Sequence, residues 1–392
     1  MKNVVVFCGG RGAEGLVRSM QGKCNLSLIV NAYDDGHSTG RLRELFNILG
    51  PSDCRKNVEY LLSKDVDENI KRYFGVRYAE CNTISEVVNA LELTIYDLNS
   101  LIVNEISAVI LEWFISSVRK ISDKLKALSG ELALRDCSLM NLVLVNEVIE
   151  QGSFQGGVDT FLSGFNVTDN IILNSEENLT LMALTRSGHI LFSEGDIVEG
   201  RSSEIIDEVY LIPHSEYSHV KEKTCSMQNY HEQVKLLRKY NVKPSLSPKA
   251  LNAINNSDVI IYAAGTANSS LYPTYITQGL SAAISASSAD KIMLTNIGAD
   301  YETPDYKASD FLKNTLNFLG SETNLSATHS YRLIDTVFVN HPFGLDRHHI
   351  VFDNMEPVFS LVNVITGDFE DPKCKGRHSD NFFEIVNKLI FN

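Results

Sequence analysis

The sequence has few basic residues for its length and no long apolar run. Its 392 residues include 35 Lys and Arg against 49 Asp and Glu, which gives a net charge of −14. Nucleic-acid binding needs a basic face that displaces counterions from phosphates, so this balance argues against it. No stretch approaches the ~20 apolar residues that a membrane span requires. An anionic ligand must therefore be held by a local site.

Cysteine pairs with metal-ligand spacing are also absent. The seven cysteines are scattered, and none belongs to a C-x-x-C pair. Neither a disulfide framework nor a cysteine zinc site is expected. The opening "MKNVVVFCGG" lacks the longer apolar core and the cleavage site of a secretory signal. These features together favour a cytoplasmic location.

Short β-branched runs separated by helical segments predict an α/β fold. Residues 4–7 are followed by a glycine loop, a helical segment and a second apolar run at 26–30. This order is typical of the start of a parallel sheet. We expect a Rossmann-like, mostly parallel sheet flanked by helices, with a helical insertion and a small antiparallel β piece.

The patterning changes along the chain and predicts three parts. Residues 1–57 and 247–392 are expected to form the Rossmann-like nucleotide-binding core. Residues 58–165 carry apolar residues at three- and four-residue spacing, which predicts a mainly helical region that buries them in a core or interface. Residues 166–246 alternate as in hairpins and then become polar, which predicts a small β piece and a polar linker.

A glycine loop follows the first predicted strand. Gly9, Gly10 and Gly12 precede a helix, where backbone N–H groups can approach a phosphate. The pattern is neither the dinucleotide fingerprint nor a Walker loop. A tight turn that only packs the helix on the sheet is the alternative interpretation.

The stretch "NAYDDGHSTGRLRELFNILGPSDCRKN", residues 31–57, follows the second predicted strand. Ligands of open α/β sheets bind at this edge. Asp34 and Asp35 could bind a Mg²⁺ ion that holds a diphosphate, and Asp53 is a third carboxylate. Arg41, Arg43 and Arg55 could pair with phosphate oxygens. The alternative is a solvated Asp-Gly turn followed by a capped helix.

Five motifs in the same order resemble one known family. They are Gly9-Gly10-x-Gly12, "YDDGHSTGRLRE", "GPSDCRKN", "LNSEENLTL" and "AAGTANSSLYP". They are similar to the family that contains the 2-phospho-L-lactate transferases (CofD-like) and the gluconeogenesis-factor proteins (YvcK-like). The resemblance is good over residues 1–57 and 247–296, moderate over 137–212 and poor over the helical region before residue 137.

The resemblance implies two alternative functions. In the transferase branch, a phosphoryl-linked group moves from a nucleoside diphosphate to an acceptor hydroxyl with Mg²⁺. In the other branch, a UDP-sugar such as UDP-N-acetylglucosamine is bound without turnover, and the protein regulates carbon metabolism or envelope synthesis. The "DDG-x-S-x-GRLR" motif looks closer to the second branch, which favours a uridine diphosphate ligand but does not decide the chemistry. We expect the transferase, with the regulator as the alternative. Family dimers also imply a homodimer.

The resemblance also implies the site residues. Asp35 and Asp53 would bind the metal or diphosphate. If the protein is an enzyme, the carboxylate and arginine cluster adds the hypothesis that Arg41 or Arg55 takes up charge on the leaving phosphate. This sequence departs from the family pattern at Cys8, Arg11 and Ala264. The ligand-binding residues would be Gly9, Gly10, Arg11, Gly12, Asp34, Gly36, Ser38, Asn141, Asn174, Ser175, Gly265, Thr266 and Ser270.

Overall fold

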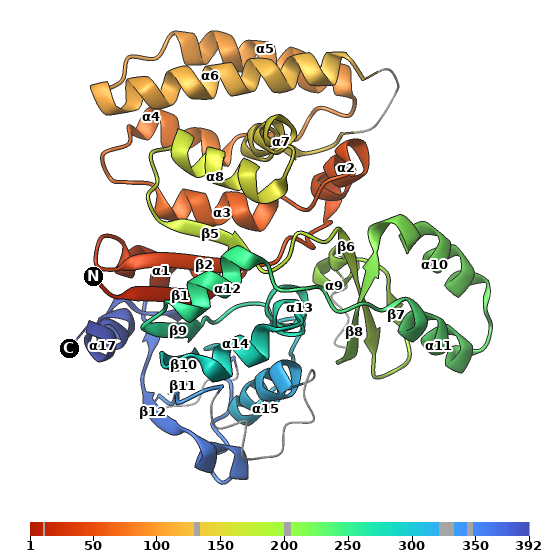
Figure 1. The fold of residues 1–392 in the computed structure, drawn as a ribbon, viewed down its shortest axis with the longest axis vertical. Helices are drawn as coiled ribbons and strands as arrows, with labels where there is room; N and C mark the ends of the chain where they lie inside the picture. Colours follow the sequence, from red (N-terminus) through yellow and green to blue (C-terminus); the bar gives the residue numbers. More distant parts are fainter. Residues whose placement is uncertain (11, 129–133, 200–204, 321–332, 343–347, 392) are drawn as a thin grey trace. The chain divides into compact units, whose positions relative to one another are not determined.

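A seven-stranded sheet organises much of the chain (Figure 1). The computed structural model describes residues 1–10, 12–128, 134–199, 205–320, 333–342 and 348–391. The strands are β1 (Asn3–Phe7), β2 (Asn25–Val30), β5 (Asn170–Leu173), β9 (Val259–Tyr262), β10 (Asp290–Leu294), β11 (Thr336–Asn340) and β12 (Asn363–Gly367). Their order is β12-β11-β10-β9-β1-β2-β5, and neighbours from β12 to β2 run parallel. The predicted Rossmann-like α/β fold is confirmed.

Helices cover both faces of this sheet, which explains why its strands are continuous apolar runs. Val337 and Val339 of β11 belong to the core cluster beneath one set of helices. Phe338 points to the other face, where its ring lies 5.5 Å from that of Phe382 in α17 (Asp380–Phe391). Helix α1 (Glu14–Met20) packs against α17. The first set is α12 (Pro248–Asn255), α13 (Tyr272–Tyr275), α14 (Leu280–Ala286) and α15 (Ala308–Gly320).

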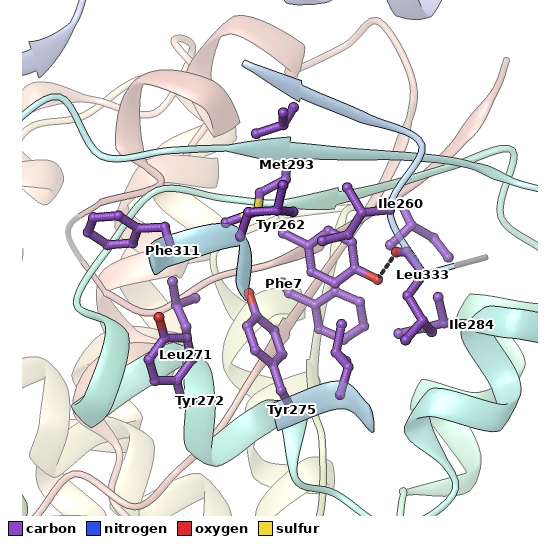
Figure 2. Packing of buried hydrophobic residues seen from close by; sticks show 14 of the residues in the cluster. Phe7, Ile260, Tyr262, Leu271, Tyr272, Tyr275, Ile284, Met293, Phe311 and Leu333 are labelled. Atoms are coloured by element: carbon purple, nitrogen blue, oxygen red, sulfur yellow. Dashed lines mark hydrogen bonds between the residues drawn. The ribbon is translucent and has the colours of Figure 1, made fainter. Parts of the chain in front are cut away.

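Aromatic rings fill the middle of this core (Figure 2). Phe7 and Tyr262, on neighbouring strands, stack with their centroids 5.5 Å apart. Tyr275 meets Phe7 edge-on at 6.0 Å. The buried Tyr262 hydroxyl donates a hydrogen bond of 2.7 Å to the carbonyl oxygen of Leu333. The ring therefore contributes apolar area without leaving its polar atom unpaired.

Two helices pack on a small antiparallel sheet. It consists of β7 (Ile190–Leu191), β6 (Leu179–Thr185) and β8 (Ile206–Pro213) in that order. The polar residues expected to form a linker instead build α10 (His214–Ser226) and α11 (Tyr230–Tyr240). Each helix has a narrow apolar stripe, and Val220, Val234 and Leu237 pack on the sheet. A second hairpin joins β13 (Glu370–Asp371) to β14 (Cys374–His378).

The chain forms two compact units, Met1–Asn31 with Ile172–Asn392, and Ala32–Ile171. The boundary expected at residue 57 lies inside the second unit, because α3 (Ser52–Leu61) packs against α7 (Leu139–Gln151). This unit is mainly helical, with a short β3 (Arg77–Tyr78) and β4 (Cys137–Ser138) pair. Its helices are α2 (His37–Phe46), α3 (Ser52–Leu61), α4 (Glu68–Lys71), the 3₁₀ helix η1 (Arg72–Gly75), α5 (Ile84–Asn99), α6 (Glu105–Lys126), α7 (Leu139–Gln151) and α8 (Phe154–Gly164).

Helix α6 has 22 residues and carries charged side chains along its length. Within the part of the chain that the structure describes, no helix combines the length and apolar character needed to cross a bilayer.

Trp113 of α6 lies in an aromatic cluster of the helical unit. Its ring centroid is 5.0 Å from that of Phe165 and 6.0 Å from that of Phe161. Gly164 lies against the same ring, and a Cβ atom there would be 2.3 Å from it. The helical unit therefore needs glycine at this position, and the protein's one tryptophan reports on its packing.

We expect Gly164→Ala to lower the free energy of unfolding of the helical unit by about 1–3 kcal/mol, because the Trp113 ring must move in a packed core. The measurement is urea unfolding followed by Trp113 fluorescence. Gly75→Ala is the matched control, since a Cβ there meets nothing within 4 Å. Equal effects of the two substitutions would contradict this packing argument.

Candidate functional site

The first turns of three helices are joined by side-chain hydrogen bonds in the helical unit. Thr39 of α2 and Ser52 of α3 share a hydrogen bond of 2.7 Å between their hydroxyls. Asn141, in the first turn of α7, donates a hydrogen bond of 3.2 Å to the Ser52 hydroxyl. Each helix N-terminus presents unpaired N–H groups and a partial positive charge. Three of them together favour an anion such as a diphosphate.

Two cationic side chains of α3, Arg55 and Lys56, belong to the same region. The Arg55 Nε donates a hydrogen bond of 3.3 Å to the side-chain Oδ1 of Asn141. Burial lowers the pKa of Arg55, and the negative charge of Glu59 partly opposes this effect. Lys56 lies 3.1 Å from Asp53, whose charge raises the pKa of Lys56 against the effect of burial. Lys56 was not among the predicted residues, although it follows Arg55 directly in "CRKN".

The Asp34–Asp35 loop is held by close backbone contacts. The Gly36 N–H donates a hydrogen bond of 3.1 Å to the Asp34 carboxylate, which makes a local turn. The helix cap of the alternative interpretation is not formed, because among the described residues neither α2 nor α3 has a side-chain hydrogen bond at its N-cap. A Cβ atom at Gly40 would lie 2.5 Å from the Asp35 carbonyl oxygen. At Gly50 it would lie 2.2 Å from the Asp34 carbonyl oxygen. Glycine is therefore needed at both positions, because a side chain there would clash with the backbone of the Asp34–Asp35 loop.

The other arginines of this motif have different surroundings. Arg43, considered as a phosphate ligand, is fully buried and donates a hydrogen bond of 3.2 Å to the Tyr33 carbonyl oxygen. It supports the loop from within. Arg41 has a side chain that is 54% exposed and pairs with Glu44 at 2.7 Å. Ser38 is buried at the start of α2. Arg55 is therefore the arginine best placed at the joined helix ends.

The predicted Mg²⁺ ligands suit that ion by donor type. Asp35 and Asp53 offer only oxygen atoms, which hard cations prefer, and Mg²⁺ takes one or two carboxylates together with substrate phosphates. The Asp53 side chain is 13% exposed, and Lys56 contacts its Oδ1. An ion at Asp53 must therefore share this carboxylate with a lysine.

In the sheet unit, the loops after β1 and β9 meet. A Cβ atom at Gly12 would lie 2.3 Å from the Ala264 carbonyl oxygen and 2.7 Å from the Gly265 Cα. Gly9 and Gly10 are buried beside the end of β1. The predicted Arg11 lies outside the described residues. The structure thus brings the first glycine loop and the "AAGTANSS" loop together.

Asn296, after β10, holds the second of these loops. Its Oδ1 accepts a hydrogen bond of 2.9 Å from the Gly265 N–H. Its Nδ2 donates one of 3.0 Å to the Gly265 carbonyl oxygen. The Thr266 and Ser270 hydroxyls are 2.9 Å apart and form a hydrogen bond with each other. The sequence signal that could have found Asn296 is a polar residue directly after a parallel strand.

Asn174 and Ser175 have mainly structural contacts. Asn174 is fully buried and donates a hydrogen bond of 2.7 Å to the Thr277 hydroxyl. Ser175 is buried, and its hydroxyl accepts a hydrogen bond of 3.2 Å from the Glu177 N–H. Their role in ligand binding stays a prediction.

Glu302 is a buried carboxylate that sequence reasoning did not find. It accepts hydrogen bonds from the N–H groups of Asn268 at 2.8 Å and Ser269 at 3.0 Å, at the start of the π-helix η2 (Ala267–Leu271). The Ser269 hydroxyl also donates to it. Burial raises the pKa of Glu302 to about 7, although the hydrogen bonds of Ser269 oppose the shift. The carboxyl can therefore gain or lose a proton near neutral pH.

A cavity of about 330 Å³ lies beside Asn268 in the same unit. Arg186 faces several acidic residues there, including Asp207, Asp305 and Asp310. The described residues that line it include none of the predicted site residues. Since four of its five charged lining residues are acidic, it suits a diphosphate less well than the joined helix ends do.

Known proteins are similar to this chain in sequence and in fold. A model of the family described as 2-phospho-L-lactate transferase CofD matches residues 4–350. The chain is 24% identical over 344 residues to a putative gluconeogenesis factor of Streptococcus pyogenes serotype M3, covering 87% of this chain and 79% of that protein. It is 26% identical over 321 residues to a gluconeogenesis factor of Halalkalibacterium halodurans, covering 81% and 74%. A crystal structure of a UPF0052 family member from Bacillus halodurans has a TM-score of 0.68, 21% identity and 100% coverage of both chains, which shows a shared fold.

We expect Glu302→Gln to change how stability depends on pH. Between its ordinary value of 4.5 and about 7, the folded protein holds a proton on Glu302 that the unfolded chain releases. This group therefore makes the free energy of unfolding fall as pH rises through that window. In the variant, the slope of the free energy of unfolding against pH should be more positive than in the wild type over this window. Urea unfolding at a series of pH values, followed by far-UV circular dichroism, measures this slope. Glu222→Gln, an exposed position on α10, should leave the slope unchanged; identical slopes in all three proteins would refute the assignment.

Proposed function

Because the chain belongs to the 2-phospho-L-lactate transferase (CofD) family, we propose that it binds a nucleoside diphosphate compound and transfers a phosphoryl-linked group from it. The observation that carries this proposal is the hydrogen-bonded set Thr39–Ser52–Asn141, with Arg55 attached to it. Helix N-termini and a guanidinium both bind phosphate oxygens. The diphosphate is the part of the ligand that we assign to these residues.

The proposed reaction depends on positioning and charge. The hydroxyl oxygen of the acceptor attacks the distal phosphorus, the bond to the bridging oxygen breaks, and a nucleoside monophosphate leaves. Arg55, with Arg41 as the other candidate, stabilises the charge on the leaving phosphate, and Asp34 or Asp35 accepts the proton of the hydroxyl. A Mg²⁺ ion held by Asp35 and Asp53 would neutralise the diphosphate.

A second candidate function is the binding of an intact UDP-sugar by a regulator. Two observations favour it. The relatives described above carry the name gluconeogenesis factor. The Lys56 ammonium lies 3.1 Å from Asp53, so one proposed metal ligand already has a positive partner without any ion. The proposed contacts of Gly9, Gly10, Gly12, Gly265, Thr266 and Ser270 stay predictions in either case.

We expect Arg55→Gln to weaken binding of UDP, GDP or a UDP-sugar by about 10- to 100-fold, since hydrogen bonds to charged groups contribute about 1.5–3 kcal/mol. Isothermal titration calorimetry with and without Mg²⁺ measures the effect. Arg55→Lys keeps the charge and should recover part of the affinity. Arg18→Gln, an exposed residue paired with Glu14, is the control. Unchanged affinity in a folded Arg55→Gln protein would exclude these residues as the diphosphate site.

A turnover assay separates the two functions. Release of a nucleoside monophosphate that needs both Mg²⁺ and an acceptor hydroxyl, and that disappears in Asp35→Asn, identifies a transferase. Tight binding of a UDP-sugar that needs no metal and is recovered intact identifies a regulator.

We also propose that the chain forms a homodimer through the exposed apolar side chains of α5, α6 and their connection. Ile102 is 92% exposed, Tyr96 76% and Val109 72%. Leu93 and Ile106 are exposed on the same helices. A surface of this kind is costly to leave in water and is typical of an interface.

Ile102→Asp combined with Val109→Asp should convert a dimer to a monomer, because a buried carboxylate without a partner opposes association. Light scattering coupled to size-exclusion chromatography measures the mass. Leu251→Asp places the same charge on an exposed apolar residue of the sheet unit and should leave the mass unchanged. A wild-type protein that is monomeric at all concentrations would rule the interface out.

A further inference from the structure

Two histidines and a glutamate converge near the C-terminal hairpin of the sheet unit. The Nε2 atom of His348 lies 2.7 Å from Oε1 of Glu370, and that of His349 lies 2.9 Å from Oε2. One ligand atom from each residue lies within 4.8 Å of the others. Among the described residues, these three side chains form the cluster of histidine, cysteine or acidic residues that could hold a metal ion.

Backbone contacts fix all three residues. The Gly376 N–H donates a hydrogen bond to Glu370 Oε1. The Ala299 N–H donates one of 3.2 Å to the His348 carbonyl oxygen, and the Ile350 N–H donates one of 3.0 Å to that of Ile297. The histidines are thus anchored to the segment that follows β10, and the carboxylate is anchored within its hairpin.

The three side chains differ in exposure. The His349 side chain is 6% exposed and that of Glu370 is 15% exposed, whereas that of His348 is 29% exposed. The group is therefore largely enclosed but open to solvent on the side of His348. Water can supply a further ligand there.

We infer that His348, His349 and Glu370 form a binding site for a divalent transition-metal ion, with Zn²⁺ as the expected occupant. Two imidazole nitrogens and one carboxylate oxygen are a donor set that suits Zn²⁺, and water completes a tetrahedral site. Hard ions such as Mg²⁺ prefer oxygen ligands, so this set discriminates against them. This inference does not rest on the function proposed above.

A metal at this position would stiffen a loop of the candidate functional site. The segment Ile297–Ala299 bonds to the backbone at His348 and Ile350. The neighbouring Asn296 exchanges two hydrogen bonds with Gly265. The ion would therefore join the C-terminal hairpin to the loops after β10 and β9. Without an ion, only the contacts of His348 and His349 with Glu370 would link the hairpin to these loops.

The test is titration of the metal-free, untagged full-length protein with Zn²⁺ in the presence of a competing chelator. We expect one ion per chain. His348→Ala and Glu370→Gln should each weaken binding by at least about 10-fold, the scale that even outer-shell substitutions reach. His341→Ala, an exposed histidine nearby that is not part of the group, should bind as the wild type does. Wild-type affinity in both site variants would overturn the proposal.

Co²⁺ provides a second measurement on the unaltered protein, in case the variants unfold. Intense visible absorption bands without thiolate charge-transfer bands would support a four-coordinate nitrogen and oxygen site. Thiolate bands would assign the ion to cysteines, and the weak spectrum of hydrated Co²⁺ would mean that no such site exists. Either of these two results would overturn the proposal.

Discussion

The loops that follow β1 and β9 approach so closely that position 12 has room for glycine alone. A Cβ atom there would lie 2.3 Å from the Ala264 carbonyl oxygen. This contact arises because neighbouring parallel strands end at the same edge of the sheet. Asn296 then ties the loop after β10 to Gly265 through two hydrogen bonds. Three successive loops are thus fixed to one another, and Glu302 holds the start of η2 within them.

The helical unit uses the same kind of contact. Gly40 and Gly50 leave room for the carbonyl oxygens of Asp35 and Asp34, while the buried Arg43 bonds to the carbonyl oxygen before them. The position of the two carboxylates therefore depends on backbone packing and on an internal cation. The joined ends of α2, α3 and α7 add the partial positive charge of three helix N-termini.

Much of the sheet could be predicted from sequence, because strands covered on both faces are continuous apolar runs, as in β1 and β9. Helices α10 and α11 could not be predicted in this way. Each buries only a narrow apolar stripe, and it does so against a sheet that has to form first. The acidic motif was found by composition, but composition does not distinguish the buried Arg43 from the partly exposed Arg41. Glu302 was missed because it is 34 and 33 residues from the two N–H groups that it binds.

Donor chemistry separates the two proposed ion sites. The helical unit offers the carboxylates Asp35 and Asp53, one of them beside Lys56, which suits a hard ion only when phosphate oxygens complete its shell. The sheet unit offers His348 and His349 with Glu370, and imidazole nitrogen favours Zn²⁺ over Mg²⁺. Binding at the first site should therefore depend on the nucleotide, whereas binding at the second should not. A metal effect that persists without nucleotide then belongs to the histidine site.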